Sequence, residues 1–276
     1  MPRQELQYPK QPYSTVKRLN DRANYELETI HRLINESRLV SVSFNDPDSP
    51  FPAVLPMIGV MGSFDRPSAD VGDVLDLYLH GYVSSRIMNL TRRTTSSPSQ
   101  DSEAAPQGGS LPLTIQTSTI TGLVLALTPN HHSYNYTSAT LFGHASLVTS
   151  PDEKLYAMAL ITNQIIPSRW EKTRVPPTPA EMSSTSILRV KISAGSAKLH
   201  SGGPSDDRFD LDNQDLTQRV WTGVVPVYTT LGEPVPGHYN QVEQVPDYLG
   251  DFVTEQNETT RKFSEHAARE EVRRKA

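Results

Sequence analysis

The chain has 276 residues, a net charge of −5 and no cysteine. Its length allows one large domain or two small ones, and the absence of cysteine excludes disulfides, thiolate nucleophiles and cysteine-ligated metals. The acidic balance provides no basic field that would attract nucleic acid or anionic lipid. The first residues are polar and predict no signal peptide. We therefore expect a cytoplasmic protein with no nucleic-acid partner and no membrane partner.

The N-terminal region predicts an irregular arm followed by a helix. Residues 1–20 are polar and contain three prolines. Apolar residues then recur at helical spacing, which predicts a helix over residues 21–37 with Asp21 or Asn24 as its N-cap. The recurring residues are Leu27, Ile30, Leu33 and Ile34.

The apolar period changes to two over residues 38–80, which predicts three strands. The first covers residues 38–44, and a turn rich in Asn, Asp and Pro follows over residues 45–50. The second strand, residues 51–60, contains two prolines, so we expect it at a sheet edge or at a bulge. The third strand covers residues 74–80.

The middle of the chain combines a short helix, an insert and two strands. Residues 83–93 predict the helix. Residues 94–112 are of low complexity and have little to bury, so we expect a mobile loop there. Strands are predicted over residues 114–127 and 138–149, and Gly143 in the second marks a bulge or a close approach of backbones.

The last part of the chain predicts a helix over residues 151–165 and a proline-rich loop over residues 167–179. Strands follow over residues 186–199 and 220–227. Residues 248–276 are highly charged and suit an exposed helix or a frayed tail.

About seven strands with singly inserted helices indicate a mostly β fold with peripheral helices. The helices do not alternate regularly with the strands, which disfavours a doubly wound parallel sheet and favours a mostly antiparallel barrel. We expect an N-terminal arm over residues 1–20, one domain over residues 21–247 and a charged C-terminal segment over residues 248–276.

Residues 77–86 form the first polar segment with chemical potential. This predicted strand ends in His80, and a histidine in such a place is more often a structural hydrogen-bonding residue than a catalyst. Ser84, Ser85 and Arg86 follow, and hydroxyls with a guanidinium suit a phosphate group. A helix that begins there would add free backbone amides, although a solvated loop is the alternative.

Residues 131–138 form a second polar segment with similar chemistry. The tyrosines Tyr134 and Tyr136 lie beside the amide of Asn135 and the hydroxyl of Ser138. This mixture suits a ligand with a ring and a phosphate, or an ordinary polar turn. No metal site is predicted, because the adjacent histidines point to opposite faces of an extended chain and no cysteine is available. We interpret the two segments as parts of one polar pocket.

Taken in order, these segments resemble the FMN-binding split-barrel family, in the branch of pyridoxamine 5'-phosphate oxidase-related proteins that includes the nitroimidazole reductases. The resemblance covers residues 15–240, and the insert at residues 94–112 is typical of a fungal-type member. The matching motifs are Pro-Ala-Val-Leu-Pro-Met at 52–57, Leu-Tyr-Leu-His-Gly at 77–81 with Ser85 and Arg86, His-Ser-Tyr-Asn-Tyr-Thr-Ser at 132–138, Trp170 with Arg174, and Trp-Thr-Gly-Val-Val-Pro at 221–226.

The resemblance implies a six-stranded antiparallel split barrel that forms a homodimer, with FMN at the subunit interface. His80 and Tyr134 are then the candidate catalytic residues, as proton donors to the substrate. Trp170 and Arg174 would approach the flavin ring from the partner subunit. The implied cofactor-binding residues are Leu55, Pro56, Met57, His80, Ser84, Ser85, Arg86, Asn135, Tyr136, Ser138, Trp170 and Arg174.

The expected function is that of an FMN-dependent oxidoreductase acting on a small organic molecule. The family often has arginine where this chain has Thr137, which leaves an alternative open. In that alternative the same barrel binds haem or another ligand without flavin, or serves a repurposed non-redox enzyme, with His80 as an axial ligand or a general acid or base. A scaffolding role for the charged segment at residues 248–276 is a third hypothesis.

Overall fold

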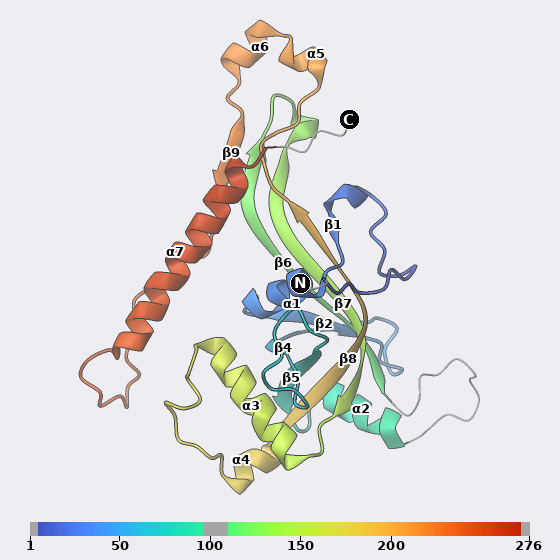
Figure 1. The fold of residues 1–276 in the computed structure, drawn as a ribbon, viewed down its shortest axis with the longest axis vertical. Helices are drawn as coiled ribbons and strands as arrows, with labels where there is room; N and C mark the ends of the chain where they lie inside the picture. Colours follow the sequence, from blue (N-terminus) through green and yellow to red (C-terminus); the bar gives the residue numbers. More distant parts are fainter. Residues whose placement is uncertain (1–4, 97–109, 272–276) are drawn as a thin grey trace. The chain divides into compact units, whose positions relative to one another are not determined.

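The computed structural model describes residues 5–96 and 110–271, so most of the predicted insert at residues 94–112 lies outside the described residues. The chain divides into two compact units (Figure 1). Unit 1 comprises Met1–Thr117 and Ser138–Lys198, and unit 2 comprises Ser118–Thr137 and Leu199–Ala276. The expected domain boundaries after residues 20 and 247 stay predictions.

A nine-stranded sheet dominates the described residues, and every pairing with a described register is antiparallel. Seven strands follow the order β3-β2-β6-β7-β8-β5-β4, while β1 pairs with β8 and β9 pairs with β6. The mostly β prediction is therefore confirmed, but the count of six strands is wrong. The strands are β1 (Ala23–Asn24), β2 (Val40–Phe44), β3 (Ala53–Met57), β4 (Gly59–Gly62), β5 (Asp76–Tyr82), β6 (Leu111–Leu125), β7 (Ser133–Leu147), β8 (Thr185–His200) and β9 (Gly223–Pro226).

The predicted strand over residues 51–60 is in fact two strands that pair with different partners. β3 pairs with β2, and β4 pairs with β5, with only Ile58 between them. Gly59, at the start of β4, lies in a crowded place: a Cβ there would lie 2.9 Å from Leu79 Cδ2 and 3.0 Å from Val40 Cγ2. The expected sheet edge is confirmed, since β3 and β4 are the two ends of the seven-strand order.

The one-residue link between the two ends of the strand order brings those ends together. Residues of β3 also contact residues of β5, which is adjacent to the opposite end of the order. The sheet is therefore curled in unit 1, as a barrel requires. Closure of the barrel stays a prediction.

Helix α1 (Leu27–Glu36) is shorter than the predicted helix over residues 21–37. Ala23 and Asn24 instead form β1 and pair with β8, and a 3-10 turn precedes them. The Asn24 side-chain oxygen accepts a hydrogen bond from the Glu26 backbone amide (2.7 Å) before the helix begins, so neither Asp21 nor Asn24 is its N-cap. The predicted apolar face is confirmed: Leu27, Ile30, Leu33 and Ile34 are buried.

The remaining helices of unit 1 lie where the sequence predicts helices or loops (Figure 1). Helix α2 (Arg86–Ser96) follows β5, and helix α3 (Pro151–Ile165) has its predicted bounds. Helix α4 (Pro179–Ser184) begins with a capping box on Thr178 at the end of the proline-rich loop. α3 packs on β4 and β5, and the shared core consists of Val60, Tyr78, Ala157, Ile161 and Ile187.

Unit 2 contains two short helices that the sequence reading missed and one long helix. The short ones are α5 (Arg208–Leu211) and α6 (Gln214–Arg219). The charged C-terminal segment forms helix α7 (Asp247–Arg269), which lies beside β9 (Figure 1). Polar side chains attach α7 to the extended chain after β9: Asn257 exchanges two hydrogen bonds with the Leu231 backbone, and Ser264 donates to the Val227 carbonyl (2.7 Å).

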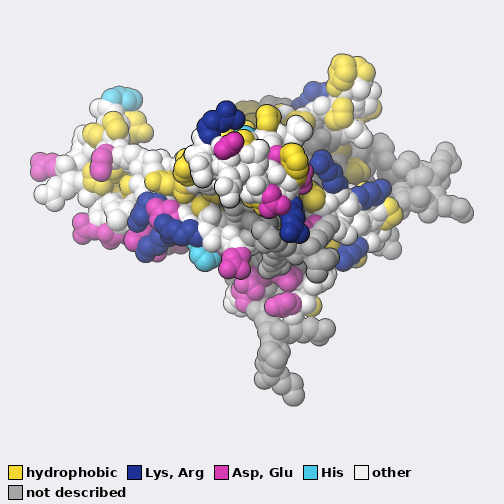
Figure 2. Space-filling model, turned by 90° about the horizontal axis from the view of Figure 1, so that it is seen from above, with side chains coloured by type: hydrophobic (Ala, Val, Ile, Leu, Met, Phe, Trp, Pro, Cys, Tyr) yellow, Lys and Arg dark blue, Asp and Glu magenta, His cyan; other side chains and the backbone are white. Residues whose placement is uncertain are grey.

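Exposed hydrophobic side chains are interspersed among charged ones on the face drawn in Figure 2. Within the described part of the chain, no helix has both the length and the apolar content that crossing a membrane requires.

Candidate functional site

The two polar segments singled out in the sequence belong to different units. Residues 77–86 lie in unit 1, at the end of β5 and the start of α2. Residues 131–137 lie in unit 2, and Ser138 is the first residue after the boundary. The single pocket expected from both segments stays a prediction.

Gly81 is the centre of the group in unit 1. A Cβ placed on Gly81 would lie 3.8 Å from Met57 Cε, 3.6 Å from Ser85 Oγ and 2.9 Å from Met88 Cε. Strand β3 therefore brings the predicted site residue Met57 close to Gly81 near the end of β5, and Ser85 lies in the turn that follows this strand. A side chain at this position would require the end of the Met88 side chain to move.

Ser85 has a buried hydroxyl oxygen with no hydrogen-bond partner in the part of the chain that the structure describes. A buried hydroxyl without a partner costs about 1–3 kcal/mol, so a ligand that bonded to it would recover free energy. The neighbouring Ser84 is exposed, and its carbonyl accepts from the Asn89 side chain (3.0 Å). The first backbone amides of α2 have no acceptor within the helix, which adds donors beside Ser85.

Arg86 forms an ion pair with Asp46, a residue that the sequence reading did not single out. Asp46 lies in the turn between β2 and β3, and its side chain is only 6% exposed, whereas that of Arg86 is 51% exposed. A hydrogen bond from the Asp48 amide and the Arg86 guanidinium lower the pKa of Asp46. The turn composition Asn-Asp-Pro-Asp was visible in the sequence, but not the contact across 40 positions.

His80 lies on β5 opposite Ile187 of β8, and its side chain reaches the surface. Partial removal from water lowers the pKa of His80, so its ring is neutral at neutral pH. A neutral imidazole can accept a proton or ligate a metal ion. On β3, Leu55 is half-buried and Pro56 is exposed.

In unit 2, the residues of the second segment are part of a strand rather than of a turn, because β7 begins at Ser133. Tyr134 is exposed and Tyr136 is half-buried, while Asn135 is fully buried and points to the other face of the strand. The Asn135 amide donates to the Gly202 carbonyl (3.0 Å), and its oxygen has no partner among the described residues. Contact of all three residues with one ligand stays a prediction.

Two residues of β7, Tyr134 and Ser138, form hydrogen bonds with residues of β8. In unit 2, His200 Nδ1 donates to the Tyr134 carbonyl (2.8 Å), and its ring lies 6.0 Å from that of Tyr136. In unit 1, the Ser138 hydroxyl donates to the Lys198 carbonyl (3.0 Å). The hydroxyl of Ser138, an expected cofactor-binding residue, thus already donates to the backbone of β8.

Trp170 and Arg174 lie in the turns after α3 in unit 1. The Arg174 guanidinium bonds to both carboxylate oxygens of Glu181 (2.5 and 2.7 Å), and this contact lowers the pKa of Glu181 to about 2. Trp170 is half-buried, and its backbone amide donates to Asn163 Oδ1 (2.7 Å). The charge of Arg174 is therefore compensated within this chain.

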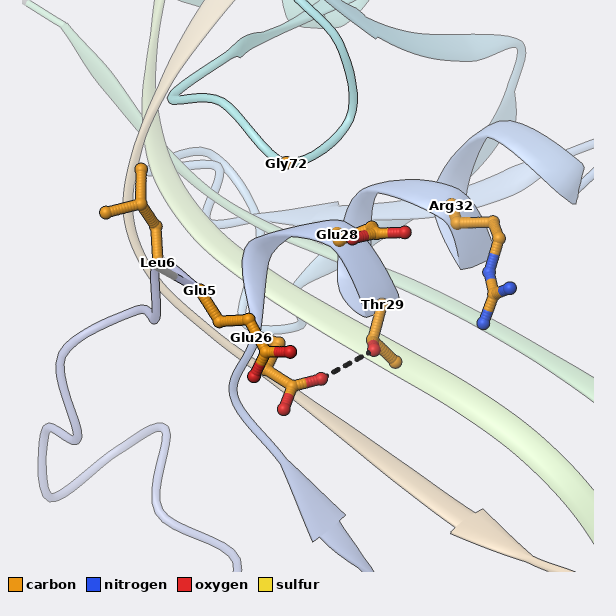
Figure 3. Close-up of a pocket in the computed structure, with 7 residues that line it drawn as sticks. All are labelled: Glu5, Leu6, Glu26, Glu28, Thr29, Arg32 and Gly72. Atoms are coloured by element: carbon orange, nitrogen blue, oxygen red, sulfur yellow. Dashed lines mark hydrogen bonds between the residues drawn. The ribbon is translucent and has the colours of Figure 1, made fainter. Parts of the chain in front are cut away.

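Unit 1 also has a cavity of about 340 Å³ that the sequence reading did not predict (Figure 3). Its walls come from the N-terminal arm, the start of α1 and the loop at Gly72, and they carry the carboxylates of Glu5, Glu26 and Glu28. None of the predicted site residues lines it. An acidic lining disfavours a phosphate-bearing cofactor, so this cavity is not the candidate flavin site.

A metal centre finds no support in the described ranges, 5–96 and 110–271. No group of three or more His, Cys, Asp or Glu side chains there could hold a metal ion.

Residues 26–199 match the family model described as pyridoxamine 5'-phosphate oxidase. The chain belongs to the pyridoxamine 5'-phosphate oxidase family. The match covers more than half of the chain, including β2 to β8 and the cluster around Gly81. No curated protein matches the sequence.

Two solved structures share the fold of this family member over most of its length. The flavocytochrome Anf3 from Azotobacter vinelandii has a TM-score of 0.68 at 23% identity, covering 88% of this chain and 97% of its own. An FAD and haem binding protein from Mycobacterium smegmatis has a TM-score of 0.64 at 23% identity, covering 84% of this chain and 97% of its own. Each of these structures aligns with a larger share of this chain than the family model matches, so the similarity in fold extends beyond residues 26–199.

Proposed function

We propose that this protein is an FMN-dependent oxidoreductase that acts on a small organic molecule. The observation that carries the proposal is the cluster at the start of α2, within the region matched by the family. There the buried hydroxyl of Ser85 lacks a partner beside an arginine and a helix N-terminus. This donor set fits the phosphate of a flavin mononucleotide, which accepts hydrogen bonds and carries negative charge.

The residues around Gly81 would hold the cofactor. Ser85 and Arg86 would bind its phosphate, and the backbone of Leu55, Pro56 and Met57 would border its ring. A bound flavin would supply the electron transfer, while the protein orients the ring and excludes water. His80 would serve as proton donor or acceptor for the substrate, as its neutral ring and partly exposed position allow.

The remaining predicted site residues enter the proposal as parts of a homodimer. Tyr134, Asn135, Tyr136 and Ser138 would contribute to flavin binding, with Tyr134 as a second candidate proton donor. Trp170 and Arg174 would approach the flavin from the partner subunit. The placement in the nitroimidazole reductase branch, the fungal type and the cytoplasmic location belong to the same proposal.

An absorbance spectrum tests the flavin. We expect the purified protein, alone or after addition of FMN, to show the flavin bands near ~370 and ~450 nm. Arg86→Ala should weaken FMN binding by about 1–3 kcal/mol, because charge-assisted hydrogen bonds lie in that range. Arg208→Ala, at an exposed arginine of α5, is the matched control and should bind FMN like the wild type. A protein that neither retains nor binds flavin would refute the proposal.

A second candidate function is haem binding on the same fold, with or without flavin. It is supported by the two structural neighbours, one a flavocytochrome and the other an FAD and haem binding protein. His80 would be the axial ligand, because its ring is neutral and reaches the surface. We expect a Soret band after haem addition that is lost in His80→Ala but kept in His132→Ala. Unchanged haem binding by His80→Ala would exclude this role.

A further inference from the structure

We propose that Asp46 is a positioning residue that holds the Arg86 guanidinium in the orientation that receives the flavin phosphate. The inference rests on the proposed function and adds a residue that neither the sequence motifs nor the family match assigns. Asp46 itself does not touch the cofactor in this proposal. It acts through Arg86.

The position of Asp46 is set by its own turn. One carboxylate oxygen, Oδ1, accepts from the Asp48 backbone amide (2.9 Å), a side-chain contact that is typical of a turn started by aspartate. Asp46 lies in the turn that connects β2 and β3, and its side chain is almost fully buried. The turn therefore fixes where the second oxygen, Oδ2, lies.

That second oxygen accepts a hydrogen bond from Arg86 Nε. Arginine has five N–H donors in a rigid plane, and Nε carries one of them. Among the described residues, Nη1 and Nη2 have no acceptor, and half of the Arg86 side chain is exposed. The contact with Asp46 thus orients the guanidinium plane and leaves its outer edge free for two bonds to one phosphate.

The orientation matters because a free arginine has many rotamers. Fixing such a side chain only when the ligand binds costs affinity, and Asp46 removes this cost in advance. Arg86 is also the first residue of α2, next to Ser85 and its unpartnered hydroxyl. Ser85, Arg86 and the first backbone amides of α2 are thus neighbours in the chain at the start of this helix.

Asp48 provides a matched control in the same turn. Its carboxylate is 76% exposed and lies 3.4 Å from Arg93 on the surface, with no contact to Arg86. If the only effect of Asp46 were its negative charge, its removal would tighten the binding of an anion, and removal of Asp48 would act in the same direction. If Asp46 instead positions Arg86, its removal weakens the binding of the anion, whereas removal of Asp48 does not, because only the loss of Asp46 releases Arg86.

The test is a titration of FMN fluorescence with wild type, Asp46→Asn, Asp46→Ser, Asp48→Asn, Arg86→Ala and the double variant Asp46→Asn with Arg86→Ala. Serine can still accept from the Asp48 amide but cannot reach Arg86, so Asp46→Ser serves if Asp46→Asn does not fold. Circular dichroism verifies the fold of each variant. We expect both Asp46 variants to bind FMN roughly three- to ten-fold more weakly, and Asp48→Asn to show no loss.

The double variant separates positioning from general damage to the structure. If Asp46 acts through Arg86, Asp46→Asn causes no further loss of FMN affinity in the Arg86→Ala background. The same loss in both backgrounds would overturn the inference, and so would unchanged or tighter binding by Asp46→Asn in the wild-type background. These outcomes leave the flavin proposal intact, whereas a wild-type protein that binds no FMN overturns both.

Discussion

His31 is fully buried, and both of its ring nitrogens are hydrogen-bonded. Nδ1 donates to the Val71 carbonyl (2.8 Å), so Nε2 is the acceptor for the Tyr8 hydroxyl (2.6 Å). Burial lowers the pKa of His31 to about 4, against a smaller opposing effect of the Val71 carbonyl. The neutral ring therefore joins the N-terminal arm, α1 and the loop before β5 within unit 1.

This environment predicts a dependence of stability on pH. In the unfolded chain His31 is protonated below pH 6.5, whereas in the folded chain it is protonated only near pH 4. The neutral buried ring therefore contributes its full stabilisation of the fold above pH 6.5, and this contribution is lost as the pH falls towards 4. The whole effect is about 3 kcal/mol. The free energy of unfolding in urea should fall between pH 7 and pH 4 in both the wild type and His31→Gln. The fall should be smaller for His31→Gln than for the wild type, by up to about 3 kcal/mol.

The exposed His132 provides the control at this scale. His132→Gln replaces an exposed histidine of unit 2 by the same residue and controls for the substitution itself, so it should follow the wild type. Equal slopes for wild type and His31→Gln would contradict the assignment of a buried neutral ring.

At the scale of elements, one side chain of α3 connects this helix to two strands of unit 1. Glu153 Oε1 accepts from the Tyr78 hydroxyl of β5 (3.1 Å) and from Arg189 Nη1 of β8 (3.0 Å). Tyr78 is fully buried, and burial together with the nearby Glu153 raises the pKa of its hydroxyl. The helix is thus held on the sheet by a buried polar contact as well as by its apolar core.

Removal of that contact should loosen the helix from the sheet. Glu153→Ala leaves the buried Tyr78 hydroxyl without its acceptor and leaves Arg189 with only the longer contact to Asp76 (3.9 Å). A buried donor that loses its partner costs about 1–3 kcal/mol. The free energy of unfolding in urea measures the change. The neighbouring Asp152→Ala removes an exposed carboxylate from the same turn of α3 and should cost less than about 1 kcal/mol. Similar losses for the two variants would contradict the role of Glu153.

At the scale of the whole molecule, unit 2 exposes several large apolar side chains on its irregular segments. Trp221 is 66% exposed, Tyr239 is 80% exposed and Val235 is 89% exposed. Association of two copies would remove such apolar groups from water, which favours an interface that includes them. Together with the homodimer implied by the family resemblance, they predict that two copies associate.

Sedimentation measures this association directly. We expect the wild type to sediment at twice the mass of the 30.7 kDa chain. Replacement of both Trp221 and Tyr239 by serine should shift the equilibrium towards the monomer if unit 2 contributes to the interface. A wild type that remains monomeric at high concentration would refute the homodimer, and a double variant that stays dimeric would place the interface elsewhere.

The sequence predicted those features of this molecule that depend on local patterns. α3 has its predicted bounds, with Ser150 as its N-cap and two acidic residues in its first turn. Gly143 is a point of close approach, as predicted, since a Cβ there would lie 2.5 Å from the Lys191 carbonyl oxygen. The buried face of α1 and the motif around His80 were likewise visible, because helical spacing and residue type are properties of short segments.

Long-range contacts decided the rest. The strand expected over residues 51–60 changes partner at Ile58, and the helix expected from residue 21 begins at Leu27 because Ala23 and Asn24 pair with a strand far away in sequence. Arg86, selected as a cation suited to a phosphate group, is held by Asp46, and no local pattern records a contact across 40 positions. Composition, period and motif thus determined the class of fold and the family, whereas pairing, burial and the state of each site residue depend on groups that only the folded chain brings together.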